Sequence, residues 1–325
     1  MQMKYLVPRQ GNLREIQPSN GGVNGLNILV SGASGFIGSA LVAHLEGQGH
    51  RVTRLVRRDT DAGPGTVFWN PGEGSLDPAG LEGLNAVVHL AGESLSSGRW
   101  TRLKKERILT SRVAGTALLA QTLAGLEQPP KVLVSASAIG YYGDRGDAEL
   151  GEDAASGRGF LAEACRAWEQ AAAPARAAGM RVVHPRFGLV LGRGGGAVGK
   201  MLLPFKLGLG GRLGSGQQVW SWISLHDLVR ALEHILTQEA LEGPVNLVAP
   251  NPVSNRQFTK VLGQVLHRPA VLPLPTALLR LMFGEMADEM LLASTHVVPT
   301  KLLASGFEYA HPDLAEALRQ ALGSS

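Results

Sequence analysis

A glycine-rich segment near the start of the chain constrains the fold more than any other feature. It reads Ile28-Leu29-Val30-Ser31-Gly32-Ala33-Ser34-Gly35-Phe36-Ile37-Gly38, so three glycines spaced three apart follow an aliphatic run. Between a strand and a helix, the first glycine permits a tight turn, the second lets the backbone approach a pyrophosphate, and the third allows close helix–strand packing. The helix that follows offers free N–H groups and a positive dipole end to phosphates. The segment predicts a dinucleotide site at Gly32, Ser34, Gly35, Phe36, Ile37 and Gly38; the alternative is a glycine-rich turn without a ligand.

Strands and helices alternate along the rest of the chain. The run Ala86–Leu90 is almost entirely apolar, which is typical of a parallel strand buried on both faces. This alternation predicts an α/β fold with a doubly wound parallel sheet and a smaller C-terminal lobe. Strands are expected at 27–31, 52–56, 67–69, 86–90, 131–135, 181–185 and 245–248, and helices include 37–46, 105–125 and 159–173.

The expected organisation has three parts. Residues 1–25 form a tail or linker, residues 26–192 form the cofactor-binding core, and residues 193–325 form a substrate-cleft region and C-terminal lobe. The strand at 245–248 returns from that lobe to the core sheet. Within the lobe, Asp227 is expected to cap the helix that runs to Leu236.

Composition excludes several classes of protein. The single cysteine, Cys165, rules out an internal disulfide and a cysteine-rich zinc site, and the nine histidines lack metal-ligand spacing. No apolar run is long enough for a membrane span, so we expect a cytoplasmic protein without a membrane partner. The formal charge of +4 is too mild for a nucleic-acid footprint and slightly favours small anionic ligands.

The end of the second predicted strand bears on the choice of cofactor. Arg57 stands nineteen residues after Gly38 and is followed by Arg58, where an NAD-binding protein usually has an acidic residue. Arginine offers bidentate, permanently charged donors that suit a 2′-phosphate. The pair therefore predicts NADP(H), whereas Asp59 and Asp61 keep NAD(H) open.

Several motifs together resemble a known family. The chain is similar to the extended short-chain dehydrogenase/reductases, which include sugar-nucleotide epimerases and dehydratases. Within them it resembles the atypical branch described as epimerase family protein, sometimes as cell-division-inhibitor-like. The resemblance covers nearly all of the chain after residue 25, and the segments that carry it include 31–38, 88–93, 111–112, 135–143, 167–169, 186–196, 203–205, 207–215, 246–252 and 283–285.

The resemblance implies further ligand contacts. Leu90, Ala91, Gly92 and Glu93 follow the fourth strand and are expected beside the ribose and adenine of the cofactor. Arg112 is expected to reach cofactor or substrate, with a surface arginine as the alternative, and Pro185 and Arg186 end the sixth strand near the nicotinamide.

The substrate is expected to be a small molecule, a nucleotide sugar or another anionic compound, and basic residues stand in the cleft region at Arg193, Lys200, Lys206 and Arg212. Related proteins also dimerise, so a homodimer through the helix at 105–125 is an expectation.

The catalytic residues match the family least well. Such reductases use a Ser together with a Tyr-x-x-x-Lys pair, in which Lys lowers the Tyr pKa and Tyr exchanges a proton with the substrate. Ser137 suits the serine role, but Phe160 and Ala164 stand at the Tyr and Lys positions.

Three interpretations follow from that departure. The protein is an oxidoreductase with a substitute acid, for which Tyr141 and Tyr142 are candidates and Glu93 is a weaker one. Alternatively, it binds NADPH only to sense it and acts through a protein partner. In the third interpretation, its substrate needs no tyrosine proton.

Overall fold

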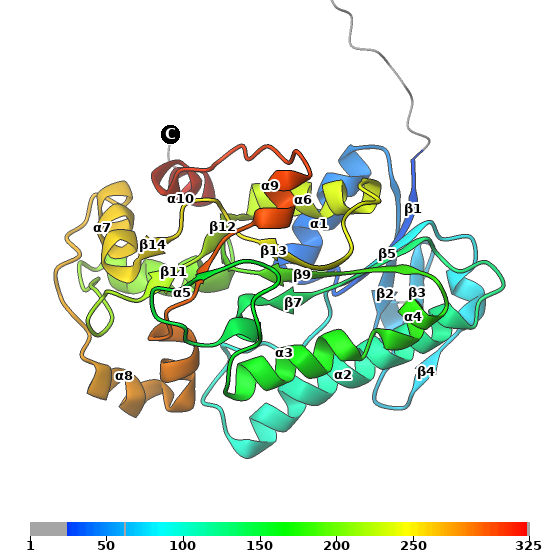
Figure 1. The fold of residues 1–325 in the computed structure, drawn as a ribbon, viewed down its shortest axis with the longest axis horizontal. Coiled ribbons are helices and arrows are strands. Elements are labelled where there is room, and N and C mark those ends of the chain that lie inside the picture. Colours follow the sequence, from blue (N-terminus) through cyan, green and yellow to red (C-terminus); the bar gives the residue numbers. More distant parts are fainter. Residues whose placement is uncertain (1–24, 62, 324–325) are drawn as a thin grey trace, which may run out of the picture.

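A nine-stranded sheet lies at the centre of residues 25–61 and 63–323, which the computed structural model describes (Figure 1). The strand order is β4-β3-β2-β1-β5-β6-β9-β13, and the short strand β7 also pairs with β9. All these pairs are parallel except β3 with β4. The strands are β1 (Asn27–Ser31), β2 (Arg51–Val56), β3 (Thr66–Asn70), β4 (Ser75–Leu76), β5 (Ala86–His89), β6 (Val132–Ser135), β7 (Ser137–Ala138), β9 (Arg181–Phe187) and β13 (Gly243–Leu247).

Helices cover both faces of this sheet, which confirms the predicted doubly wound α/β fold. One face packs against α1 (Phe36–Gly47) and α6 (Leu225–Thr237), and the other against α2 (Arg102–Ala124), α3 (Phe160–Gln170) and α4 (Ala173–Ala177) (Figure 1). Each face has its own apolar core. Leu41 and Leu45 of α1 are fully buried on the first face, and Leu119 and Leu123 of α2 on the second, so both strand faces are apolar as expected.

The direction of winding reverses between β1 and β5, which are neighbours in the sheet although β2 follows β1 in the chain. Ligands of open α/β sheets bind beyond the carboxyl ends of the strands at such a reversal. The glycine-rich segment follows β1 directly and therefore lies at that point.

A further apolar core, separate from those on the two faces of the sheet, belongs to the C-terminal half of the chain. Trp222, Phe258 and Leu318 are buried at its centre. It is built from β10 (Leu189–Leu191), α5 (Gly196–Lys206), β11 (Val219–Trp220), β12 (Trp222–Ser224), β14 (Val253–Ser254), α7 (Asn255–Val265) and α10 (Leu314–Leu322). The remaining elements are β8 (Glu149–Leu150), α8 (Thr276–Phe283), β15 (His296–Val297), α9 (Thr300–Ala304), the 3₁₀ turns at Asp59–Asp61, Pro78–Leu81 and Ile139–Tyr142, and a π-helical turn at Ala287–Leu291.

One detail of α6 differs from expectation. Ser224 is the N-cap, and its hydroxyl accepts the N–H of Asp227. The Asp227 carboxylate lies inside the first turn and accepts the N–H groups of Ala310 and His311, at 2.8 and 2.9 Å. The residue therefore fastens a later loop to α6 rather than capping the helix. The expected tail at 1–25 lies, except for residue 25, outside the described residues.

Candidate functional site

The glycine-rich turn after β1 has the geometry that its spacing predicts. Gly32 has φ +67°, a left-handed conformation that favours glycine, and its carbonyl accepts the N–H of Gly35 at 2.9 Å. A Cβ atom on Gly38 would lie 2.1 Å from the Gly32 oxygen, so only glycine fits there. Gly35 is the N-cap of α1 and supplies no side chain to the first N–H groups of that helix. These groups are available to an anion.

A hollow of about 480 Å³ lies at the first turn of α1. Arg193, expected on the substrate side, is among the residues that line this hollow. The glycines after β10 let the chain pass close to α1, because a Cβ atom on Gly195 would lie 2.5 Å from the Phe36 ring. The hollow is lined by Ser34, Gly35, Phe36, Ser39, Ala40, Arg193, Gly194 and Leu225.

The two arginines after β2 differ in their surroundings. Leu55 of β2 pairs with Ser31 of β1, so Arg57 follows directly beside the turn. Both arginines are exposed, but Arg58 donates to the Asp61 carboxylate at 3.1 Å. Within the described chain no ion pair engages Arg57, so Arg57 is better placed to receive a phosphate.

Ser31 and His89 join the ends of β1 and β5. The Ser31 hydroxyl oxygen accepts the N–H groups of Leu90 and Ala91, at 3.1 and 3.2 Å, and lies 2.6 Å from His89 Nδ1. With two donors already directed at that oxygen, its own proton goes to Nδ1, which makes His89 the neutral Nε2–H tautomer. Burial lowers the pKa of His89 to about 4, so the ring is uncharged at neutral pH. The contact fixes the segment predicted to line the cofactor ribose.

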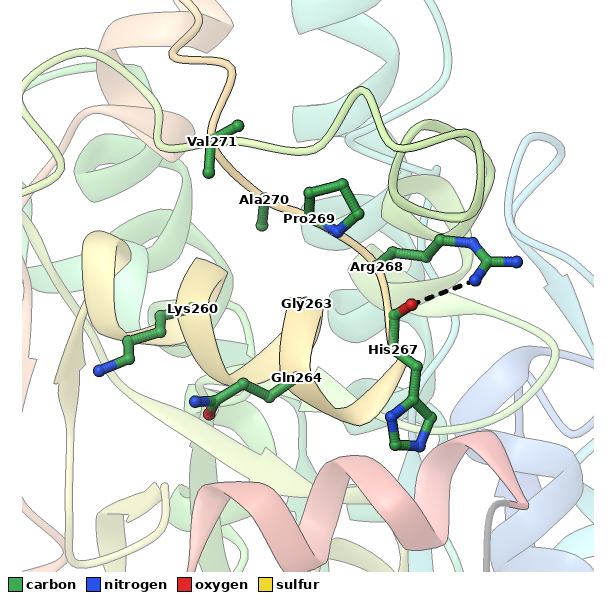
Figure 2. Close-up of a pocket in the computed structure, with 8 residues that line it drawn as sticks. All are labelled: Lys260, Gly263, Gln264, His267, Arg268, Pro269, Ala270 and Val271. Carbon is green, nitrogen blue, oxygen red and sulfur yellow. Dashed lines mark hydrogen bonds between the residues drawn. The ribbon is translucent and has the colours of Figure 1, made fainter.

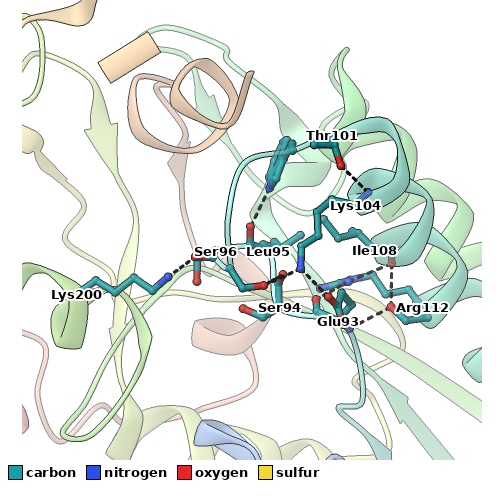
Figure 3. A network of polar contacts seen from close by, with 12 residues as sticks. Glu93, Ser94, Leu95, Ser96, Thr101, Lys104, Ile108, Arg112 and Lys200 are labelled. Atoms are coloured by element: carbon teal, nitrogen blue, oxygen red, sulfur yellow. Dashed lines mark hydrogen bonds and ion pairs between the residues drawn. The ribbon is translucent and has the colours of Figure 1, made fainter. Parts of the chain in front are cut away.

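The loop after β5 is held by a polar network (Figure 3). The buried Lys104 ammonium donates to Glu93 Oε1 and to Ser97 Oγ, each at 2.6 Å. The hydrogen bond from Lys104 lowers the pKa of Glu93, so this carboxyl is ionised at neutral pH and has no proton to donate. Glu93, the weaker acid candidate of the sequence, is therefore a member of the loop scaffold.

Arg112 lies beneath the same loop (Figure 3). Its NH1 donates to the carbonyls of Glu93 and Ile108, at 3.0 and 3.2 Å, and its guanidinium lies 4.9 Å from the centroid of the Trp168 ring. The side chain is half-buried and supports the loop from the α2 side. A direct contact of Arg112 with cofactor or substrate stays a prediction.

Ser137 stands beside a buried ion pair beyond the ends of β6 and β9. Its hydroxyl donates to Glu169 Oε1 at 2.7 Å. Arg186, directly opposite Ser137 in the β7–β9 register, donates through Nε and NH2 to the two Glu169 oxygens, each at 2.9 Å. The Arg186 and Glu169 side chains are only 3% and 14% exposed. Burial by itself would lower the pKa of Arg186, but the hydrogen bonds and the charge of Glu169, with the contact to Tyr142, together raise it, so this guanidinium stays charged.

The two candidate tyrosines are in different environments. Tyr142 is fully buried; its hydroxyl donates to Asn246 Oδ1 at 2.8 Å and accepts from Arg186 NH1 at 2.9 Å. Burial raises the pKa of Tyr142, which makes it a poor proton donor. Tyr141 is half-buried, and its ring faces the Arg186 guanidinium at 3.5 Å. Of the two phenols, only that of Tyr141 has access to a ligand.

Phe160, at the predicted tyrosine position, begins α3 and packs on Trp100 with ring centroids 5.3 Å apart. Its N–H and that of Leu161 donate to the carboxylate of Glu289, at 2.8 and 2.7 Å. Glu289 comes from the π-helical turn after α8, so a distant carboxylate caps this helix. Ala164 is buried within α3.

The four cations expected to hold a substrate anion do not gather. Lys200 donates to the carbonyl of Ser96, which links α5 to the loop after β5 (Figure 3). Arg212 donates to the carbonyls of Gly214 and Ser215 in its own turn. Arg193 lines the hollow at the first turn of α1, and Lys206 is exposed at the end of α5. The described residues therefore hold no cluster of these cations.

Sequence reasoning missed Glu169 and Asn246. Glu169 falls four residues after Cys165 on the buried stripe of α3, and an acidic residue on a buried stripe calls for a partner. The position of Glu169 on that stripe could have pointed to it as a buried, partnered residue. Asn246 lies in β13 and carried no such signal.

Burial raises the pKa of Cys165 to about 11, in keeping with a packing role.

The part of the chain that the structure describes lacks both a metal-binding cluster and a membrane-spanning helix. Over residues 25–61 and 63–323, no group of three histidine, cysteine, aspartate or glutamate side chains has a metal-binding arrangement. None of the helices there combines the length and apolarity needed to cross a bilayer.

Comparison with solved structures finds the same architecture. The crystal structure of the human epimerase family protein SDR39U1 (isoform 2) with NADPH matches with a TM-score of 0.84 and 38% identity, over 92% of this chain and 100% of that chain. MoeE5, solved in complex with UDP-glucuronic acid and NAD, matches with a TM-score of 0.73 over 92% of this chain and 98% of that chain. At 21% identity, the second match shows the shared fold alone.

Sequence comparison gives the family. Epimerase family protein Mb2239 of Mycobacterium bovis is 43% identical over 291 residues, covering 90% of this chain and 96% of that protein. Human SDR39U1 is 40% identical over 298 residues, covering 91% and 99%. A family model described as a domain of unknown function (DUF1731) matches residues 274–321, and the model of the NAD dependent epimerase/dehydratase family matches residues 28–248. The chain therefore belongs to the NAD dependent epimerase/dehydratase family.

Proposed function

We propose that the protein is an NADP(H)-dependent oxidoreductase or epimerase-like enzyme that acts on a small, anionic substrate. One observation carries the proposal: the phosphate-binding turn after β1 and the Ser137–Tyr141 segment after β6 lie at the same carboxyl edge of the sheet. The turn fits a dinucleotide, since a Cβ atom at Gly32 or Gly38 would fill the space where the chain folds tightly. The NADPH-bound human relative supports the choice of cofactor.

Four groups of residues would hold the cofactor. The turn from Gly32 to Gly38, with its Ser34, Phe36 and Ile37, would bind the pyrophosphate, and Arg57 would bind the 2′-phosphate. Leu90, Ala91 and Gly92 would border the ribose, and Pro185 would lie beside the nicotinamide. When bound, the nicotinamide supplies or accepts a hydride.

The chain's own residues would handle the substrate oxygen. Tyr141 would exchange a proton with it, and Arg186 would keep the Tyr141 ring in place through the contact at 3.5 Å. Ser137 donates its hydroxyl proton to Glu169, so its oxygen presents lone pairs and would orient a substrate hydroxyl by accepting from it. This assignment makes Arg186 and Glu169 positioning residues.

A second candidate function is a protein that binds NADPH without catalysis and acts through a protein partner. Two observations favour this function. Ser137 already donates its hydroxyl proton to Glu169, and Phe160, at the predicted tyrosine position, packs on Trp100.

Cofactor binding tests the first step of the proposal. Thermal stabilisation by NADPH and by NADH should follow RT ln(1 + [L]/Kd). We expect NADPH to stabilise the protein more, and Arg57→Ala to raise the Kd for NADPH by about ten-fold, the loss of about 1.4 kcal/mol, while leaving NADH binding unchanged. Arg51→Ala, at the opposite end of β2, is the matched control and should change neither value. Tighter binding of NADH, unaffected by Arg57→Ala, would contradict the NADP(H) assignment.

Turnover separates the two functions. NADPH oxidation is measured with a panel of aldehydes, ketones and nucleotide sugars. In an enzyme, Tyr141→Phe should lower kcat by about 10²-fold or more without changing NADPH binding. Tyr142→Phe serves as the comparison, since it removes a buried hydroxyl that has no access to substrate. NADPH binding without turnover by the parent protein across the panel would favour the non-catalytic function.

A further inference from the structure

Two long stretches of the C-terminal half contain no acidic residue. Neither 194–226 nor 243–284 includes an aspartate or glutamate, although the whole chain has 27 of them in 325 residues. The same stretches carry seven lysines and arginines. These are Lys200, Lys206, Arg212, Arg256, Lys260, Arg268 and Arg280.

The folded chain brings parts of both stretches together. Leu272 donates its N–H to the Gly210 carbonyl at 3.1 Å, and Leu274 donates to the Arg212 carbonyl at 2.9 Å. Arg268 donates through Nε to the Lys206 carbonyl at 3.1 Å. The end of α5 and the turn after it therefore lie beside the segment that follows α7. We call the surface formed by residues 203–212 and 260–272 the basic apolar face.

Large apolar side chains are exposed on this face. Phe205 anchors α5 in the core of the C-terminal lobe, whereas Leu203 and Leu207, on either side of it, are 67% and 64% exposed. Leu209 is 59% and Val271 75% exposed. Exposed large apolar residues that gather on one face mark an interaction surface.

Within the part of the chain that the structure describes, the basic side chains of the face have no acidic partner. Lys206, Lys260 and Arg268 are exposed, and in the described chain no salt bridge includes any of them. Lys260 and Arg268 border a hollow of about 560 Å³ between α7 and the segment after it (Figure 2). Gln264 of α7, His267 just after that helix, and Val271 also line this hollow (Figure 2).

We propose that the basic apolar face binds the surface of a bilayer that contains anionic phospholipid. Such a surface offers phosphate charges for the lysines and arginines, with hydrocarbon directly beneath for the leucines. A second copy of the chain fits less well, because an isologous contact would set this acid-free face against itself and oppose like charges. An acidic protein partner would match the charges, but the exposed leucines project from a helix and a turn rather than line a groove.

The location connects this face with the candidate site. Lys200, on the same helix, contacts Ser96 in the loop that borders the site. A protein docked through α5 would therefore hold that loop near the bilayer. The proposal departs from the expectation of no membrane partner, which was based on the lack of a spanning segment; a peripheral contact needs no such segment. The proposal does not depend on the oxidoreductase activity.

Vesicle binding tests the proposal with the full chain. Sedimentation with vesicles of phosphatidylcholine alone is compared with vesicles that also contain phosphatidylglycerol. We expect binding only to the anionic vesicles and weaker binding at higher salt. Each basic residue near an anionic surface contributes about five-fold, so the double variant Lys206→Glu/Arg268→Glu should bind at least about 25-fold more weakly. Leu207→Ser/Leu209→Ser should also lose at least about ten-fold, since both remove inserted hydrocarbon.

A matched variant controls for general effects of charge and apolarity. Lys131→Glu/Leu303→Ser changes an exposed lysine and an exposed leucine outside the face and should bind like the parent protein. Thermal unfolding establishes that each variant is folded before it is compared. Equal binding of the face variants and the parent, equal binding to neutral vesicles, or no binding to either would overturn the proposal. It would also be overturned by a lipid-independent dimer that Leu207→Ser/Leu209→Ser dissociates, or by polyglutamate binding as tightly as the anionic vesicles.

Discussion

Arg186 holds both oxygens of Glu169, with Nε and NH2 each 2.9 Å from its acceptor. The pair joins the end of β9 to the last turn of α3. Glu169 also accepts the hydroxyl proton of Ser137, and Arg186 also donates to the Tyr142 hydroxyl. The polar groups around the candidate site therefore form one connected unit, and removing one member leaves the others buried without partners.

Breaking this ion pair should destabilise the protein strongly. Arg186→Met leaves a buried carboxylate without its cation, and we expect the free energy of unfolding to fall by about 3–5 kcal/mol. The double variant Arg186→Met/Glu169→Gln should lose less than the sum of the two single variants, because neither charge is then left alone. Urea unfolding of all four proteins measures this. Additive losses would contradict the coupling, and Arg54→Met, in an exposed pair, should cost no more than about 1 kcal/mol.

Two glycine substitutions in helices should have opposite effects. Gly38→Ala would place a Cβ atom 2.1 Å from the Gly32 oxygen, so the phosphate-binding turn must open and NADPH binding should be lost together with stability. Gly199→Ala in α5 meets nothing within 4 Å and should stabilise the protein by about 0.5–1 kcal/mol. Thermal unfolding with and without NADPH gives both results. Undiminished NADPH binding by Gly38→Ala would show that the turn does not bind the cofactor.

Glu289 should contribute to the stability of α3 from a distance in sequence. Glu289→Ala removes the acceptor of two backbone N–H groups at the helix start, and the expected loss is about 1–2 kcal/mol. Asp288→Ala is the neighbouring control. Asp288 pairs only with the exposed Arg280, so its loss should be well below 1 kcal/mol. Equal losses in urea unfolding would mean that the cap contributes nothing specific.

His89 should make stability depend on pH on the acid side. Burial lowers its pKa to about 4 in the folded protein, against 6.5 when exposed. Between these values the unfolded chain binds the additional proton, so the free energy of unfolding falls as the pH drops from about 6.5 towards 4. At pH 5 the loss amounts to about 2 kcal/mol.

The variant His89→Asn isolates this effect. It keeps an acceptor for the Ser31 hydroxyl but has no titrating ring, so the stability difference between pH 7 and pH 5 should shrink by about 2 kcal/mol. His184, whose pKa burial also lowers to about 4, accounts for part of what remains. His267→Asn at an exposed position is the control and should leave the difference unchanged. A parent-like pH dependence in His89→Asn would contradict the assignment.

The candidate site could be predicted in part. The phosphate-binding turn was readable because each of its glycines meets a local steric need, as Gly38 does against Gly32. The sequence also drew attention to Ser137 and to the adjacent tyrosines. It could not separate Tyr141 from Tyr142, because their difference in burial depends on how β13 and its Asn246 pack beside the turn at 139–142.

The amino-acid sequence by itself determined seven strands of the central sheet and the helices α1, α2 and α3, since hydrophobic periodicity and glycine positions act over a few residues. It also determined which residues follow each strand at the carboxyl edge of the sheet. Tertiary structure alone decided that Glu169 pairs with Arg186, that Arg193 lines the hollow at the first turn of α1, and that Glu289 caps α3. The physical reason is that these contacts join separate elements, so they depend on how those elements pack and on burial that leaves each charge only one partner.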